Sequence, residues 1–265
     1  MRLSRGARWA LRIAMALGLA FIYVPLAMVL VNSFNADRTF AWPPPRWTTR
    51  WWAAAWDNTG ARDALWTSVK AGLCAAAVAL VLGSLVAFAV QRHRFFGRNA
   101  VSLLVVLPIA LPGIVTGIAL DTAFRSVIEP LGVGKGLLSV VIGHATFCVV
   151  VVYNNVLARL RRLGGNLEEA SADLGADAVQ TFRFVTFPLL RSALFAGGLL
   201  AFALSFDEII VTTFTAGPGV QTLPIWIFNN LFRPNQAPVI NVVAAVLIVF
   251  SIVPIYMAQR VSDTP

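Results

Sequence analysis

Six apolar stretches, each close to the roughly 20 residues that an α-helix needs to cross a bilayer, dominate this sequence. They cover residues 12–32, 66–90, 100–121, 137–158, 191–213 and 239–258. Of the 265 residues, 58% are hydrophobic and 12% are charged, whereas a water-soluble domain has about 25% charged residues. We therefore expect an all-α integral membrane protein with six transmembrane helices, and the same composition excludes disorder.

The first apolar stretch follows four arginines and at first resembles a secretory signal peptide. Its apolar part is longer than the usual stretch of about 7–15 residues, and no small-residue cleavage site follows it. We interpret it as a retained first helix. Prolines at Pro25, Pro108, Pro112 and Pro254 fall inside the stretches and predict kinks there, because membrane helices tolerate proline better than soluble helices do.

Lysine and arginine are divided unequally between the two sides that six spans define. Thirteen of the 21 lie on one side, in the amino terminus, the 91–99 loop, the 159–191 loop and the tail. The other eight include four in the long 33–65 segment, where charge has less influence on topology. The positive-inside rule therefore places both termini in the cytoplasm. This bias also accounts for the net charge of +9, so no nucleic-acid partner is expected.

The 33–65 segment, predicted to lie outside, is rich in tryptophan and proline. Five tryptophans surround or follow Pro43-Pro44-Pro45, and Thr48 or Thr49 is available to cap a short helix. A short interfacial helix is expected, with the tryptophans either anchoring the chain at the lipid headgroups or contacting a docking partner. The chain shows no repeat or linker, so residues 1–265 are expected to form one transmembrane domain.

The cytoplasmic 159–190 loop is unusually polar and rich in small residues. Asn166 can cap a helix whose first turn carries Glu168 and Glu169, and Gly175 can end that helix in a left-handed conformation. Two short helices are therefore predicted to meet at a bend. The loop keeps apolar side chains at Leu174, Val179, Phe182 and Val185. Such a surface is suited to insert into a groove of another protein.

One motif in this loop is specific. The run Glu169-Ala170-Ser171-x-x-x-Gly175, followed after nine residues by Val185-x-Phe187-Pro188, resembles the EAA motif of permease subunits in bacterial ATP-binding-cassette importers. Ser171, Val185 and Phe187 stand where Ala, Ile and Leu are commoner, and the spacing is intact.

That resemblance implies a type I importer permease fold whose loop is a coupling-helix pair docked on a cytoplasmic ATPase. It assigns coupling, and no bond-making chemistry, to the loop residues Glu168, Glu169, Ala170, Gly175, Phe182 and Pro188. The implied partners are a second homologous permease, two ATPase copies, an external substrate-binding protein and the lipid bilayer. The implied location is the bacterial inner membrane.

The stretch Leu204–Leu231 extends the resemblance. It contains Ser205-Phe206-Asp207-Glu208, Thr215-Ala216-Gly217-Pro218-Gly219 and Thr222-Leu223-Pro224-Ile225, and it is similar to permeases of the spermidine/putrescine type. The resemblance covers nearly the whole chain and implies a small organic cation, a polyamine, as cargo. The group also includes importers of other solutes, so an amino acid derivative, an opine-like compound or an iron complex is the alternative.

Asp207 and Glu208 are the most informative charges, because fifteen uncharged residues precede them in the fifth apolar stretch. Ionisable residues at membrane depth are rare and normally face a cavity or a partner. On a continuous helix the two side chains would point about 100° apart. We consider three roles for them: lining the substrate pathway, pairing with the second permease, or a shallow hydrated position.

No cofactor is expected in this chain. Gly132-Val133-Gly134-Lys135-Gly136 lacks the first glycine and the final Ser or Thr of a phosphate-binding loop, so ATP and Mg are expected to be bound by the partner ATPase. His93 and His144 have no metal-ligand spacing around them, and packing or a hydrogen bond is the expected role. A membrane-embedded enzyme would need carboxylates and histidines that converge, and a passive channel a ring of polar residues; the sequence offers neither.

Overall fold

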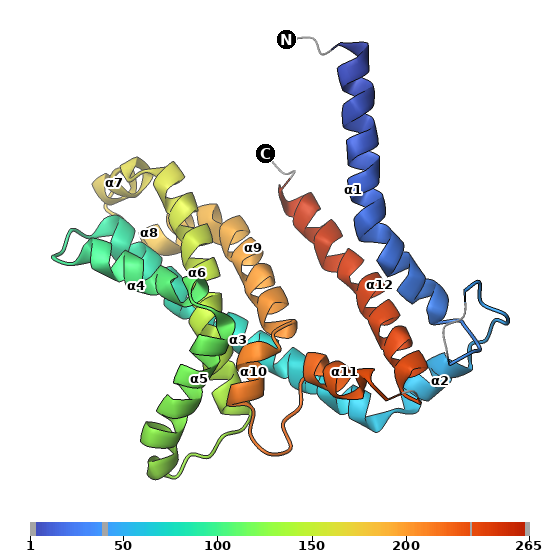
Figure 1. The fold of residues 1–265 in the computed structure, drawn as a ribbon. Helices are drawn as coiled ribbons and strands as arrows, with labels where there is room; N and C mark the ends of the chain where they lie inside the picture. The colour runs from blue at the N-terminus through green and yellow to red at the C-terminus, as the bar shows by residue number, and fades with distance from the viewer. Residues whose placement is uncertain (1–3, 39–41, 234, 263–265) are drawn as a thin grey trace. The chain divides into compact units, whose positions relative to one another are not determined.

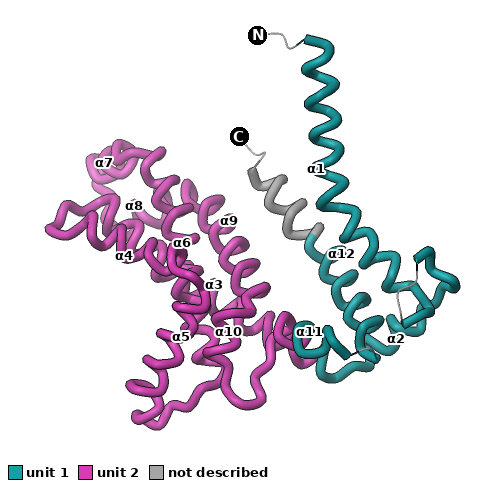
Figure 2. Tube along the Cα trace, in the orientation of Figure 1, with its two compact units in different colours: residues 1–61, 227–256 teal, residues 62–226, 257–265 magenta. Residues whose placement is uncertain are grey.

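The computed structural model of the chain describes residues 4–38, 42–233 and 235–262. Within these ranges the secondary structure is helical, and pairing between extended segments is confined to one isolated bridge, Asn35 with Trp47 (Figure 1). The chain divides into two compact units (Figure 2), one of residues 1–61 and 227–256 and the other of residues 62–226 and 257–265. The single transmembrane domain expected from the sequence stays a prediction.

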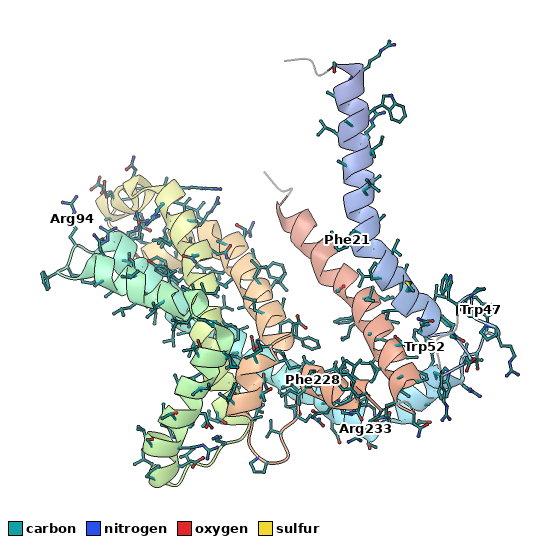
Figure 3. The ribbon with its side chains drawn as sticks, in the orientation of Figure 1. Phe21, Trp47, Trp52, Arg94, Phe228 and Arg233 are labelled. Carbon is teal, nitrogen blue, oxygen red and sulfur yellow. The ribbon has the colours of Figure 1, made fainter. Side chains whose placement is uncertain are left out.

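The first unit contains α1 (Arg5–Asn32), α2 (Arg50–Asp57) and most of α12 (Ala237–Ser262), while α11 (Leu223–Leu231) lies at the boundary. The hydroxyl of Ser4 accepts the N–H of Ala7 at 3.2 Å and so caps α1. No residue of α1 is buried, and large apolar side chains such as Phe21 project from it (Figure 3). An apolar helix with this exposure requires lipid or another apolar partner around it.

The tryptophan-rich segment forms a small closed structure before α3. The Trp51 ring is buried; its N–H donates to the Asn35 carbonyl at 2.9 Å, and Arg50 lies over the ring at 4.3 Å. Phe34 stacks on Trp52 with ring centroids 5.2 Å apart. The predicted short helix is therefore present as α2. Residues 39–41 of the segment lie outside the described residues. The segment ends at residue 58, earlier than predicted, because α3 begins at Thr59.

The second unit is built around α6 (Leu137–Leu163), which packs along α9 (Phe187–Phe206) and also against α4 (Arg98–Ala110) and α10 (Ile210–Thr215). Tyr153 and Leu160 of α6 and Leu190 of α9 are among its fully buried side chains. On α3 (Thr59–Arg92), a Cβ atom added to Gly83 would lie 2.9 Å from the Val149 carbonyl oxygen. Glycine at this position therefore allows α3 and α6 the close backbone approach typical of membrane helices.

The predicted six spans correspond to fewer uninterrupted helices. Four helical stretches in the described residues are long and apolar enough to cross a membrane: Arg5–Asn32, Thr59–Arg92, Leu137–Leu163 and Ala178–Phe206. A bent pair, α4 with the stretch Gly113–Leu131, adds a fifth, and the apolar part of α12, Ala237–Ser251, is shorter. The all-helical membrane fold is confirmed, whereas a count of six spans stays a prediction that depends on α12.

The third predicted span, residues 100–121, is not one straight helix. It is divided into α4 and α5 (Gly113–Ala123), followed by short turns η1 (Phe124–Ile128) and η2 (Glu129–Leu131), with a bend of 107° between the two arms. Leu111 at the break is extended, as expected of a residue before proline. Proline at Pro112 predicted a kink here, and the chain makes a much sharper turn than a kinked helix would.

The fifth predicted span, residues 191–213, was also wrong as a continuous helix. Helix α9 ends at Phe206 and α10 begins at Ile210, so Asp207 and Glu208 lie at a break. Their predicted separation of about 100° on one helix therefore does not apply.

The predicted 159–190 loop, which precedes this span, is mostly helical. Helix α6 continues to Leu163, and the helical stretch that runs through α9 starts at Ala178.

Candidate functional site

Two short helices form the predicted loop, α7 (Asn166–Asp173) and α8 (Ala178–Thr181). Gly175 has a φ of +84°; its N–H donates to the Ala172 carbonyl at 2.9 Å, and the next N–H, from Ala176, donates to the Ser171 carbonyl at 3.1 Å. These two bonds and the left-handed residue define a Schellman motif. The predicted left-handed end of the first helix is confirmed.

The amino-terminal caps of the two short helices differ from expectation. Asn166 was predicted to cap α7, but it lies within the first turn; Gly165 holds the cap position and makes no side-chain bond. The cap of α8 was not predicted: the Asp177 carboxylate accepts the N–H groups of Val179 and Gln180, each at 2.8 Å. The Gln180 side chain accepts the Asp177 N–H at 3.0 Å and completes a capping box.

Polar and aromatic contacts join the two short helices to each other and to α3. The hydroxyls of Ser171 and Thr181 lie 3.0 Å apart. The Phe182 ring meets Phe88 of α3 edge-on at 5.9 Å and lies 6.1 Å from Phe187. Phe182 belongs to η3 (Phe182–Thr186), a π-helical turn just before Pro188, which has no N–H for a regular helical bond. Of the predicted coupling residues, Phe182 thus contacts other rings of the chain, while 47% of its surface stays exposed.

A different set of loop side chains projects outward. Leu174 is 90% exposed and Val179 74% exposed, and Leu167 and Phe184 are exposed as well. We call these four residues the docking face. Glu169, Ala170 and Pro188 are exposed too. Apolar side chains with this exposure on polar short helices favour a contact with another protein.

Glu168 turns inward from the loop. Its Oε1 accepts a charge-assisted hydrogen bond from Nη2 of Arg92, at the end of α3, at 2.9 Å. The same oxygen accepts the Thr186 hydroxyl at 2.9 Å. No sequence signal pointed to these contacts, because Arg92 is 76 residues from Glu168 along the chain.

The break between α9 and α10 gives the two predicted carboxylates different environments. Glu208 is half-buried; its Oε1 accepts the N–H of Val211 at 2.9 Å and caps the first turn of α10. Asp207 is exposed, and within the described residues its carboxylate has no hydrogen bond or ion pair. Glu208 therefore has a structural task, whereas Asp207 is available to a ligand or a partner.

Fully buried His144 of α6 holds both sides of this break. Its Nδ1 lies 2.6 Å from the Ser205 hydroxyl of α9 and its Nε2 2.7 Å from the Thr212 hydroxyl of α10. Thr212 donates its single hydroxyl proton to the Glu208 carbonyl at 2.7 Å, so its oxygen accepts from Nε2 of His144, which therefore carries a proton. The hydrogen-bonding role expected for His144 is confirmed.

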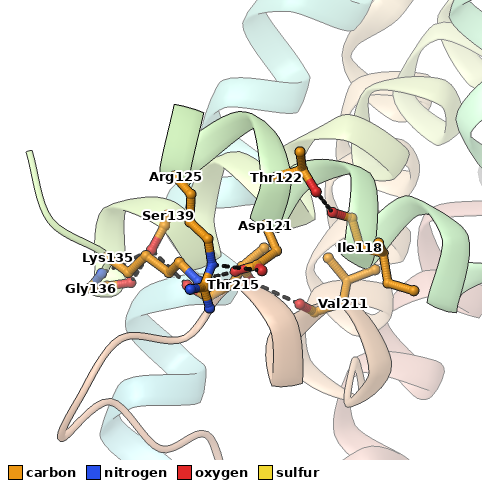
Figure 4. A network of polar contacts seen from close by, with 9 residues as sticks. All are labelled: Ile118, Asp121, Thr122, Arg125, Lys135, Gly136, Ser139, Val211 and Thr215. Carbon is orange, nitrogen blue, oxygen red and sulfur yellow. Dashed lines mark hydrogen bonds and ion pairs between the residues drawn. The ribbon is translucent and has the colours of Figure 1, made fainter. Parts of the chain in front are cut away.

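A second polar network fixes the other end of α10 (Figure 4). The Thr215 carbonyl accepts the Ser139 hydroxyl at 2.7 Å, and Asp121 forms ion pairs with Arg125 and Lys135. Gly117 of α5 also allows close packing, because a Cβ atom there would lie 2.5 Å from the ring of Phe214. Short α10 is thus tied to α5 and α6, and the residues of the 207–209 break are held in place.

Known proteins resemble this chain in sequence and in fold. The family model described as binding-protein-dependent transport system inner membrane component matches residues 79–263. The chain belongs to this family. Its members are transport components of the inner membrane, which confirms the importer permease resemblance seen in the sequence.

Named relatives cover most of the chain. The putrescine transport system permease protein PotI of Escherichia coli K12 is 32% identical over 240 residues, covering 89% of this chain and 84% of the relative. The spermidine/putrescine transport system permease protein PotC of Haemophilus influenzae is also 32% identical, covering 92% of each chain. The putative 2-aminoethylphosphonate transport system permease protein PhnV of Salmonella typhimurium LT2 is 29% identical.

A solved structure supports the fold. A chain of a bacterial ABC transporter involved in the import of the acidic polysaccharide alginate matches with a TM-score of 0.67 and 16% sequence identity, covering 99% of this chain and 98% of that one. At this identity the match shows the shared fold alone. The expected importer permease fold is confirmed, with the bent and broken helices described above.

The described residues form no cluster of three His, Cys, Asp or Glu side chains that could hold a metal ion. The expectation that this chain carries neither metal nor cofactor stays a prediction.

Proposed function

We propose that this family member passes a small polyamine cation, such as putrescine or spermidine, across the inner membrane as one of two permeases in an ATP-driven importer. The observation that carries the proposal is the 32% identity, over about nine tenths of the chain, to permeases of putrescine and spermidine/putrescine systems. The exposed Asp207 carboxylate supports a cationic cargo, because it supplies negative charge at a break in an apolar stretch.

The docking face supports coupling to an ATPase. Its residues lie on α7, in the turn after α7, on α8 and in η3. The two short helices are stiffened by a Schellman turn, a capping box and the hydroxyl contact between Ser171 and Thr181. A rigid apolar projection can transmit motion into the helices that follow it. The coupling residues proposed for contact with the ATPase are therefore Glu169, Ala170 and the docking face, with Gly175 shaping the turn.

The family description, a component of a binding-protein-dependent transport system, supports an external substrate-binding protein as a partner. The lack of a phosphate-binding loop in the sequence supports a separate ATPase, in two copies, that binds ATP and Mg. The second permease would complete the pathway, with the Asp207 side of the 207–209 break facing it.

Uptake by the reconstituted complex tests this function. The chain is co-purified with its partner subunits and placed in proteoliposomes. These vesicles are expected to accumulate radiolabelled putrescine or spermidine only when ATP and the external binding protein are both present. Unlabelled polyamine should compete for uptake. ATP-dependent uptake that polyamines do not inhibit would contradict the proposed cargo but leave the importer role standing.

A second cargo has a specific observation in its favour. The 29% identity to the putative 2-aminoethylphosphonate system permease supports a zwitterion that shares a primary ammonium group with the polyamines. The same proteoliposomes distinguish the two, since competition by 2-aminoethylphosphonate and none by putrescine would favour the zwitterion.

Thiol labelling tests the proposed orientation, in which both termini are cytoplasmic. In a background lacking exposed Cys74 and buried Cys148, single cysteines at exposed Asn99 and Asn166 should react with an impermeant thiol reagent only from the cytoplasmic side. A cysteine at exposed Pro218 should react from outside. The 91–99 loop, from which Arg94 projects (Figure 3), carries three of the thirteen charges on which this orientation depends. Reversed labelling would contradict it.

A further inference from the structure

Glu168 joins three segments of the second unit through one carboxylate oxygen. This oxygen accepts from Arg92 at the carboxyl end of α3 and from Thr186 in the turn before α9, both at 2.9 Å. Glu168 itself belongs to α7. We call Arg92, Glu168 and Thr186 the latch. Among the described residues, the ion pair between Arg92 and Glu168 connects the loop to the long apolar helix α3.

The neighbouring carboxylates of α7 face opposite environments. The side chain of Glu168 is 27% exposed and that of Arg92 20%, whereas Glu169 is exposed. Consecutive helical residues point about 100° apart, so one acid can face α3 while the next faces outward beside the docking face. The two glutamates are therefore suited to different tasks.

Aromatic packing supports the latch from α3. Phe88 precedes Arg92 by four residues, so the two side chains lie on one face of that helix. Phe88 contacts Phe182 of the loop edge-on, with the ring centroids 5.9 Å apart. The last turn of α3 thus contacts the loop through an ion pair and an aromatic pair. Helix α3 and the loop can therefore move together.

Helix α3 extends this connection to the far side of the unit. The hydroxyl of Ser68 accepts the backbone N–H of Leu223 at 2.8 Å, in the segment that follows α10. From Ser68 to Arg92 the helix measures about 36 Å at 1.5 Å per residue. One rigid element therefore reaches from the loop to the segment that leads away from the 207–209 break.

We propose that the latch is the joint through which movement of the docked loop is transmitted to α3, and that Glu168 is a positioning residue with no contact to the ATPase. This inference rests on the proposed function of the loop. The pair is partly buried, with side chains 20% and 27% exposed, so each single variant leaves one charge without its partner, and the retained ATPase subunits must be measured beside uptake. What the loss of the pair removes is the transfer of motion from the loop to α3.

A charge swap tests the latch. Arg92→Glu and Glu168→Arg, made singly and together, are compared for ATP-dependent uptake, ATP hydrolysis and the amount of ATPase subunit retained in the purified complex. Each single variant should lower uptake per ATP hydrolysed by about tenfold, a change of about 1.4 kcal/mol, and should retain its ATPase subunits. The double variant, in which the two charges are exchanged, should recover most of the wild-type uptake per ATP hydrolysed, because it restores the ion pair with its polarity reversed. Where Arg92→Glu fails to accumulate in the membrane, Arg92→Gln provides the same comparison.

Two results would overturn the latch: a single variant with the wild-type ratio of uptake to hydrolysis, or a swapped pair that assembles without recovery. Loss of ATPase subunits from the Glu168→Arg complex would indicate that Glu168 contacts the ATPase beside the docking face. That result would also overturn the latch, but it would leave the proposed function intact. Cross-linking from exposed Val179 in the wild-type complex separates the two proposals. If that position never cross-links to the ATPase, the proposed docking function itself fails.

Discussion

Asp207→Asn is expected to lower polyamine uptake by about tenfold or more while the amount of assembled complex stays unchanged. The exposed Asp207 carboxylate has no intramolecular partner among the described residues, so its neutral isostere disturbs no contact seen in the chain. In a half-hydrated pathway with an effective dielectric constant of about 20, a carboxylate attracts a cation 4 Å away by about 4 kcal/mol before desolvation is subtracted. Initial rates of labelled putrescine uptake, divided by the quantity of purified complex, measure the effect.

Glu208 provides the matched control, because the same chemical change should have a smaller effect there. In Glu208→Gln the amide oxygen can still accept the Val211 N–H that the carboxylate now accepts. Glu208→Ala loses this cap, and loss of a helix cap costs about 1 kcal/mol of stability. Normal uptake by a fully assembled Asp207→Asn, Glu208→Gln double variant would remove both residues from the pathway and weaken the case for a cationic cargo.

Much of the fold follows from apolar length and local turn chemistry, which the sequence displays directly. The helices α1, α3 and α6 contain three of the predicted stretches, because about 20 consecutive apolar residues leave few alternatives to a spanning helix. The bend after Gly175 was predictable for a similar reason, since a glycine after a short polar helix is a common C-terminal signal.

The break at 207–209 was less predictable, because its cause lies elsewhere in the chain. Residues 191–213 read as one apolar stretch interrupted only by two acids, which a continuous helix could also carry. His144, more than sixty residues away, bonds to hydroxyls on both sides of the break. A single polar residue in an apolar span predicted packing or a hydrogen bond, but the sequence could not show which segments such a bond joins.

The latch was missed for the same physical reason. Two adjacent glutamates at a helix start are adequately explained by the helix dipole, and this local explanation gave Glu168 and Glu169 one role. Only the tertiary structure separates them, since Arg92 and Thr186 approach α7 from distant positions in the sequence. Local signals therefore located the loop, while the division of tasks within it depends on contacts between remote segments.

Gly175→Val is expected to abolish uptake while leaving the protein in the membrane. Residue 175 has a φ of +84°, and a β-branched residue in this region is strained by about 1–3 kcal/mol. That strain is smaller than the stability of a typical domain, about 5–15 kcal/mol, so the chain should still fold. The two hydrogen bonds of the Schellman motif hold the turn between α7 and α8. Their loss would change the direction of α8 and of the docking face. Membrane content, retained ATPase subunits and uptake are measured on the same preparation.

Gly175→Asn separates backbone strain from crowding. No atom lies within 4 Å of a Cβ added at this position, so a larger side chain meets no steric barrier, and asparagine tolerates the left-handed region better than most residues. Asn should therefore keep most of the uptake that Val loses, and Ala should give an intermediate value. If all three substitutions reduce uptake equally, the positive φ is not the reason that glycine is needed, and wild-type uptake by Gly175→Val would remove this turn from the coupling path altogether.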